Sequence, residues 1–91
     1  MNINDLLFYM KCGEEIEVYI DGKSYFLQPN YEIVKKDCDN NPAYPFTIIY
    51  DSCDYERPKK IFEGSAEDII DYVFENKYTF RNNMDKFKFV G

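Results

Sequence analysis

The sequence contains no histidine, and this absence limits the chemistry that the chain can perform. Imidazole is the usual general acid or base near neutral pH, and it commonly activates a cysteine nucleophile. The glycine-rich phosphate and dinucleotide loops and the HExxH and GxSxG motifs are missing as well. Carboxylates at residues 51–56 and 67–71 are the remaining catalytic candidates, but such clusters are usually solvated surface charge. We therefore expect a protein that is not an enzyme.

Long hydrophobic runs are also missing. The longest apolar stretches, such as residues 46–50, are only a few residues long, whereas a helix needs about 20 residues to cross a bilayer. The opening residues 1–5 have neither the basic nor the apolar region of an export signal. The sequence therefore predicts a cytoplasmic protein, and its 91 residues are enough for a single domain over 1–91.

Cysteine is scarce and irregularly placed, because Cys12, Cys38 and Cys53 are an odd number without CxxC spacing. In the reducing cytosol we expect free thiols, with Cys12 filling a gap in the core near a helix end. A regulatory disulfide between Cys38 and Cys53 and a zinc site are the two alternatives to free thiols. The carboxylates near these two cysteines are Asp37, Asp39, Asp51 and Asp54. Since zinc usually takes four nitrogen or sulfur ligands and no imidazole is present, we expect no cofactor.

Acidic residues, by contrast, are in excess. The chain has 17 acidic and 11 basic side chains and a net charge of −6. Nucleic acids and anionic membranes attract Lys and Arg and repel carboxylates, so neither is an expected partner. The charge balance instead predicts a protein partner with a basic groove.

The first part of the chain predicts a helix followed by a β-hairpin. Apolar residues at positions 3, 6, 7 and 10 have helical spacing, with Asn4 expected to cap the first turn and Gly13 to end the helix. Alternating residues at 16–20 and 23–28 flank Asp21-Gly22, which is the signature of a type I′ turn. A turn of two residues predicts the register, in which the facing pairs are Ile20 with Lys23, Val18 with Tyr25, and Ile16 with Leu27.

The remaining elements complete a predicted α+β fold. After a turn at Pro29-Asn30 we expect strands at 31–36, 46–50 and 59–63, with a loop at 37–45 and the last strand in the centre of the sheet. Ser65 and Asp68 form a predicted capping box that opens a helix. The apolar face of that helix is expected to comprise Ala66, Ile69, Ile70, Val73 and Phe74. A short second helix and an edge strand at 87–90 would follow. The prediction is an antiparallel sheet of four or five strands with an N-terminal helix and one or two C-terminal helices.

Charge is unevenly distributed along the last third of the chain. Between Lys60 and Lys77 there are five acidic residues and no basic residue. Asp68, Asp71 and Glu75 would lie on one face of the predicted helix and span about 10 Å. One interpretation is a solvated polar face; the other is a row of carboxylates that imitates nucleic-acid phosphates, with a tyrosine as an anchor. The predicted partner-binding residues are Glu63, Glu67, Asp68, Asp71, Tyr72 and Glu75.

Several tyrosines fall on predicted polar faces or loops. Exposed tyrosine is favoured at protein interfaces, because its ring buries area at a low cost in conformational entropy and its hydroxyl group can form a hydrogen bond. The surrounding charge is mostly negative, which disfavours stacking on nucleic-acid bases. These tyrosines are Tyr9, Tyr19, Tyr44, Tyr55 and Tyr72.

The opening Met1-Asn2-Ile3-Asn4-Asp5-Leu6 resembles that of a type II-A anti-CRISPR family of Listeria prophages, as do the small size, acidic composition and helix-sheet-helix layout. Members of this functional class inhibit Cas9, and that family presents acidic residues to the site that would read duplex DNA. The resemblance implies a phage protein that acts as a DNA mimic on a Cas nuclease. The alternatives are a regulatory domain that binds another protein or forms a homodimer through a sheet edge, and a small zinc-binding protein.

Overall fold

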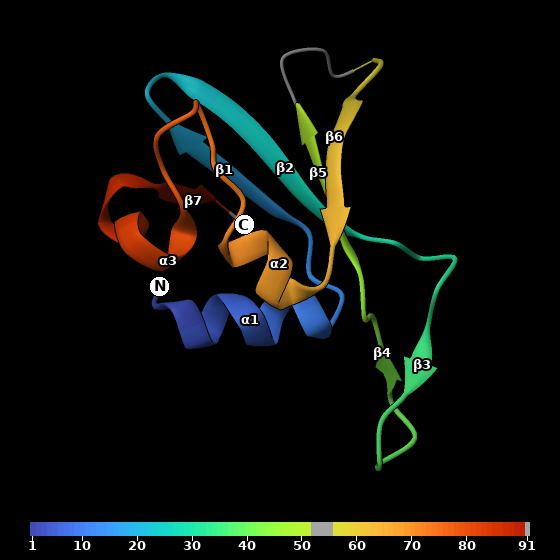
Figure 1. Ribbon diagram of the computed structural model, residues 1–91. Helices are drawn as coiled ribbons and strands as arrows, with labels where there is room; N and C mark the ends of the chain where they lie inside the picture. The colour runs from blue at the N-terminus through green and yellow to red at the C-terminus, as the bar shows by residue number, and fades with distance from the viewer. Residues whose placement is uncertain (52–55, 91) are drawn as a thin grey trace.

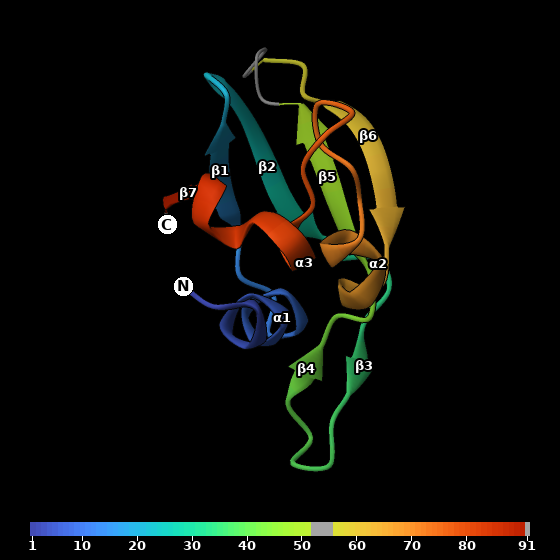
Figure 2. The ribbon, with the colours of Figure 1, turned by 60° about the vertical axis from the view of Figure 1, so that its left-hand side comes forward.

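A five-stranded antiparallel sheet with helices gathered on one face forms the body of the computed structural model (Figures 1 and 2). The structure describes residues 1–51 and 56–90. The strand order is β6-β5-β2-β1-β7, and β3 and β4 form a separate two-stranded sheet. The elements are α1 (Ile3–Lys11), β1 (Ile16–Ile20), β2 (Lys23–Pro29), β3 (Lys35–Lys36), β4 (Pro42–Ala43), β5 (Thr47–Asp51), β6 (Lys59–Gly64), α2 (Ala66–Ile70), α3 (Phe80–Asn83), the 3-10 helix η1 (Met84–Lys86) and β7 (Lys88–Val90). The predicted α+β class is confirmed.

The N-cap of helix α1 lies two residues earlier in the chain than predicted. Asn2, not Asn4, is the N-cap: its backbone is extended, and its side-chain oxygen accepts a hydrogen bond from Asp5 N–H at 2.9 Å. Gly13 follows the helix with a φ of +89°, as predicted for a helix end. Cys12 is exposed, so the prediction that it fills a gap in the core is wrong. None of the helices in residues 1–51 and 56–90 is long and apolar enough to cross a membrane.

The hairpin of β1 and β2 has the predicted register. Ile20 faces Lys23, Val18 faces Tyr25 and Ile16 faces Leu27. Asp21 and Gly22 have φ values of +49° and +76°, as a type I′ turn requires. Along β1, the buried residues alternate with half-buried ones, so one face of the hairpin points into the core.

The predicted strand at 31–36 is wrong. Only Lys35 and Lys36 are in a strand, β3, and they pair with β4 rather than with the main sheet. The place beside β2 is taken by β5, whose Thr47, Ile48 and Ile49 are all buried. Because that strand buries side chains on both faces, it gains more from the central position than residues 31–42, all of which are exposed. Residues 31–46, hereafter the arm, project from the body in both views (Figures 1 and 2).

Both edges of the main sheet are short or interrupted. Strand β6 is an edge strand, not the predicted central one, and a register shift leaves Ile61 without a partner on β5. A bulge and charged residues such as Lys59 and Lys60 are features that discourage pairing with another chain. The opposite edge is β7, which confirms the predicted edge strand at 87–90 and pairs with β1.

The core lies between the helices and the inner face of the sheet, and aromatic rings fill much of it. Phe74 is 1% exposed, and its ring centre lies 4.8–5.3 Å from those of four other aromatic residues. These neighbours are Tyr25, Tyr72, Phe80 and Phe87. Val73, which was expected on the buried helix face, is 51% exposed because the helix has already ended at Ile70.

Candidate protein-binding surface

The acidic residues after β6 do not form the predicted helical row. Helix α2 has only five residues; Asp71 is its C-cap, and Glu75 lies in a tight turn. Glu75 and Asn76 have φ values of +54° and +56°, which no helix accommodates. The turn is closed by Phe74 and Tyr78, whose backbone N–H and C=O groups bond to each other at 2.7 and 2.9 Å. The prediction of one ridge carrying Asp68, Asp71 and Glu75 is therefore wrong.

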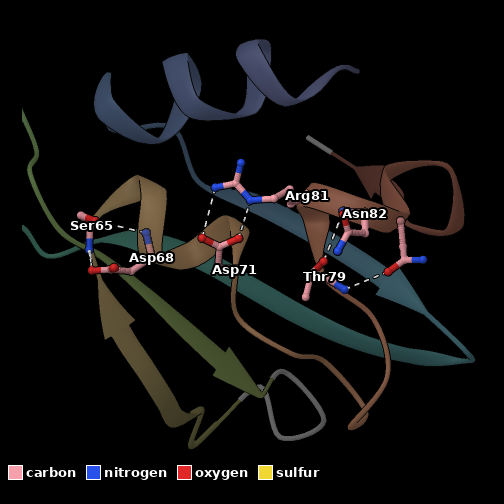
Figure 3. Close-up of polar contacts among 7 residues, drawn as sticks. Ser65, Asp68, Asp71, Thr79, Arg81 and Asn82 are labelled. Atoms are coloured by element: carbon pink, nitrogen blue, oxygen red, sulfur yellow. Dashed lines mark hydrogen bonds and ion pairs between the residues drawn. The ribbon is translucent and has the colours of Figure 1, made fainter.

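Four of the five acidic residues between Lys60 and Lys77 form ion pairs within the chain. Arg81 reaches from α3 to Asp71, and its two N–H groups donate to both carboxylate oxygens at 2.6 and 3.1 Å (Figure 3). The other pairs are Lys11–Glu67 at 2.9 Å, Lys23–Glu75 at 3.2 Å and Lys60–Glu63 at 2.5 Å. Lys11, Lys23 and Arg81 come from outside this region and Lys60 from the same strand as Glu63, so the negative field of this region is weaker than its sequence indicates.

The fifth acidic residue, Asp68, has the structural role that the sequence predicted. Its carboxylate accepts the Ser65 N–H at 3.0 Å, and its own N–H donates to Ser65 Oγ at 3.2 Å (Figure 3). Both bonds of the capping box are therefore present. Tyr72 is half-buried, and its ring packs on Phe62 and Phe74 at centroid distances of 5.0 and 4.8 Å. Its contacts place it at the margin of the core.

The ion pairs also lower the pKa values of the carboxyl groups. Hydrogen bonds from Lys60, Lys11 and Arg81 are the main causes of the low pKa of Glu63, Glu67 and Asp71, respectively. For Glu75 the main cause is the Tyr25 hydroxyl, which donates to it, and Lys23 adds to the effect. Burial is the main cause that raises the pKa of Tyr25, and the same contact adds to it.

We expect the protein to lose thermal stability as the pH falls below about 4.5, the region where unfolded carboxyl groups protonate. Lowered pKa values in the folded state stabilise it at higher pH, and this contribution disappears as the pH falls through those values. The melting temperature, followed by circular dichroism between pH 7 and pH 3, measures the effect. Asp71→Asn should make the pH profile shallower, and Arg81→Gln should do so to a similar extent. A profile identical to the wild type in both variants would contradict this role of the pair.

A second acidic group lies where α1 ends and β1 begins. It comprises Glu14 and Glu15 after Gly13 and Glu17 on β1, hereafter the glutamate patch. Glu14 and Glu15 are exposed, and Glu17 is half-buried. Within the ranges 1–51 and 56–90, none of them forms an ion pair. The patch thus keeps its negative charge, whereas the region after β6 is largely balanced.

Tyrosines accompany the glutamate patch. The Tyr31 hydroxyl donates to Glu15 Oε1 at 2.7 Å, and this bond is the main reason that the pKa of Tyr31 rises to about 12. The ring of Tyr44 meets that of Tyr31 edge-on at 5.6 Å. Tyr9 is 39% exposed and, with Glu14 and Glu15, lines a shallow cavity of about 360 Å³. Neutral hydroxyl groups and carboxylates therefore share one surface, a composition suited to binding cations on another protein.

Sequence reasoning did not select Glu14 and Glu15 as site residues. A signal was present, because Glu14-Glu15-x-Glu17 is a dense acidic run that directly follows a glycine at a helix end. Whether this run can attract a partner depends on which carboxylates of the chain already form ion pairs, and contacts between distant segments decide that. Of the other predicted exposed tyrosines, Tyr19 and Tyr44 are half-buried, and Tyr55 lies outside the described residues.

The predicted zinc ligands are only partly within the described residues. Cys38 is an exposed free thiol in the turn of the arm, and Cys53 and Asp54 lie outside the described ranges. Asp37 has a local role: its Oδ1 accepts the N–H groups of Asp39 and Asn41, both at 2.9 Å. In the described part of the chain no three metal-ligating side chains are grouped so that they could hold a metal ion.

Comparison with protein-family models, with curated proteins and with solved structures found no match to this chain.

Proposed function

We propose that this chain is a non-enzymatic protein-binding domain that docks on a basic surface of its partner through the glutamate patch and its tyrosines. The observation that carries the proposal is the separation of charge. Four of the five acidic residues between Lys60 and Lys77 are paired with Lys or Arg, while Glu14, Glu15 and Glu17 have no such partner in the described residues. An uncompensated patch attracts a positively charged surface and accelerates its association.

Within this proposal the partner is a cytoplasmic nucleic-acid enzyme, and the specific candidate is a Cas nuclease. Enzymes that hold DNA line their grooves with Lys and Arg, which bind phosphates. Carboxylates that occupy those positions exclude DNA, so the domain would act as an inhibitor and a DNA mimic. The net charge of −6 and the resemblance of residues 1–6 to a family of Cas9 inhibitors support this candidate.

The residues predicted from the sequence stay candidates for a secondary contact. Glu67 and Asp71 are more than half exposed, so a partner's cations could replace Lys11 and Arg81. Such an exchange breaks one ion pair for each new one, and its net gain is smaller than that of an unpaired carboxylate. We therefore place the main contact on Glu14 and Glu15.

We expect Glu14→Gln/Glu15→Gln to weaken binding to purified Cas9 with its guide RNA by about tenfold and to reduce its salt dependence, because two uncompensated charges are removed. The matched control is Glu67→Gln/Asp71→Asn, since both double variants change the net charge from −6 to −4. The control should lose less than about threefold. Binding is measured by biolayer interferometry at low and physiological salt. Equal losses in both variants would remove the special role of the patch, and no binding of the wild type to Cas9 would reject this nuclease as the partner.

A further inference from the structure

Strand β7 has a free edge whose hydrogen-bonding groups can be assigned from the hairpin. A two-residue turn closes on a hydrogen-bonded pair, here Ile20 and Lys23. Since bonded and non-bonded pairs alternate along β1, its residues 17 and 19 direct their N–H and C=O groups toward β7. They face Val90 and Lys88, so the N–H and C=O of Phe89 point away from the sheet.

A groove runs along this edge, between β7 and the start of α1. It consists of two hollows of about 360 and 600 Å³ that share Met1 and Phe89 in their walls. Figure 2 shows β7 at the border of the sheet, with the N-terminus directly below it. Met1 is 55% exposed and Phe89 half-buried, so apolar surface remains accessible beside an unpaired strand edge. Added strands bind by satisfying such backbone groups and filling such hollows.

The two ends of the groove differ in charge. Glu14 and Glu15 line the hollow that also contains Val90, while Arg81 and Asp85 line the hollow at the other end. Arg81 is already paired with Asp71. Among the described residues, two carboxylates without an ion pair, those of Glu14 and Glu15, lie at the end where β7 finishes, against one, that of Asp85, at the other end.

We propose that the glutamate patch recognises an extended segment of its partner, which adds to β7 as an antiparallel sixth strand of the main sheet. An antiparallel strand begins where β7 finishes, so the segment would place Lys or Arg at its N-terminal end beside Glu14 and Glu15. Its side chains alternate in direction. Those facing the helices would cover Phe89 and Met1 and would be apolar, whereas those on the other face would be polar. This inference rests on the proposed function and specifies how the partner binds.

The test uses an amidated peptide with the sequence Arg-Lys-Val-Thr-Val-Thr-Val and a second peptide with the reverse order. The ¹⁵N-labelled protein is titrated with each, and amide exchange is followed by NMR. We expect the first peptide to slow exchange of the Phe89 N–H by about tenfold or more, as a new backbone hydrogen bond does. The reversed peptide and the Glu14→Gln/Glu15→Gln variant should each bind about fivefold more weakly. The Asp21→Asn/Asp39→Asn variant changes the net charge by the same amount at residues that line neither hollow, and it should bind like the wild type.

Several results would overturn strand addition. They are unchanged exchange at Phe89, chemical shift changes confined to the arm or the outer sheet face, equal affinity for both peptide orders, or self-association that already protects β7. Strand addition and the proposed function can fail separately. If the patch variant lost Cas9 binding while the Phe89 N–H of the wild type still exchanged freely in the complex, the function would be kept and strand addition rejected. Insensitivity of Cas9 binding to the patch would reject the function itself.

Discussion

Replacing Phe74 by alanine is expected to lower the free energy of unfolding by about 3–5 kcal/mol. The Phe74 ring is 1% exposed and touches four aromatic rings from β2, α3 and the segments around them. Its removal leaves a cavity that those rigid rings cannot fill without moving, and it also loses their edge-to-face contacts. Because domains of this size are stable by about 5–15 kcal/mol, the variant should be close to unfolding at 37 °C.

Urea denaturation followed by circular dichroism measures this loss. Phe8→Ala is the matched control, since it removes the same ring from a position that is 62% exposed. The control should change the free energy of unfolding by less than about 0.5 kcal/mol. Similar losses in both variants would show that Phe74 is not at the centre of the core.

Gly13→Ala is expected to cost about 2–4 kcal/mol, through two separate effects. Gly13 has a φ of +89°, which alanine rarely adopts, and a Cβ atom there would lie 2.6 Å from Cε2 of Tyr44. The Tyr44 ring packs on Gly13, and the backbone N–H of Tyr44 donates to the C=O of Lys11 at 3.1 Å. Together these contacts hold the base of the arm on the end of α1. Moving Tyr44 would also disturb Tyr31 and its bond to Glu15, so binding of the partner should weaken in parallel.

Gly22→Ala separates the two effects. Gly22 also has a positive φ, +76°, but no atom would lie within 4 Å of an added Cβ. This control should therefore show only the backbone cost, about 1–2 kcal/mol, with no loss of partner binding. If both glycine variants were destabilised equally, contact with Tyr44 would not contribute to stability, and the arm would not be held by Gly13.

Local signals in the sequence predicted local structure well. Asp21-Gly22 predicted both the hairpin and its register, because a two-residue turn leaves only one way to pair the flanking residues. The capping box of Ser65 and Asp68 depends on residues three positions apart and was also found where expected. The cap of α1 was misplaced by two residues because Asn2 and Asn4 are both suitable caps, and only the extended backbone at Asn2 distinguishes them.

Predictions failed where distant segments compete for one place. The run at 31–36 has the composition of a strand, yet β5 takes the place beside β2 because its residues can be buried on both faces. The helix after Ser65 was expected to continue to Glu75, but Asp71 caps it and the following turn directs Phe74 into the core while Glu75 accepts a hydrogen bond from Tyr25. Tertiary packing overrides helix propensity, which amounts to less than about 1 kcal/mol per residue.

The sequence by itself determined the α+β class, the hairpin, the first residues of the helices to within one turn, and the excess of negative charge. These features depend on composition and on residues close together in the chain. Only the tertiary structure decided where that charge is uncompensated. Lys11, Lys23, Lys60 and Arg81 each meet an acidic residue from the 63–75 segment, and three of these four pairs join parts of the chain that are ten or more residues apart. Coulomb energy depends on distance in space, so the glutamate patch became recognisable only after the chain had folded.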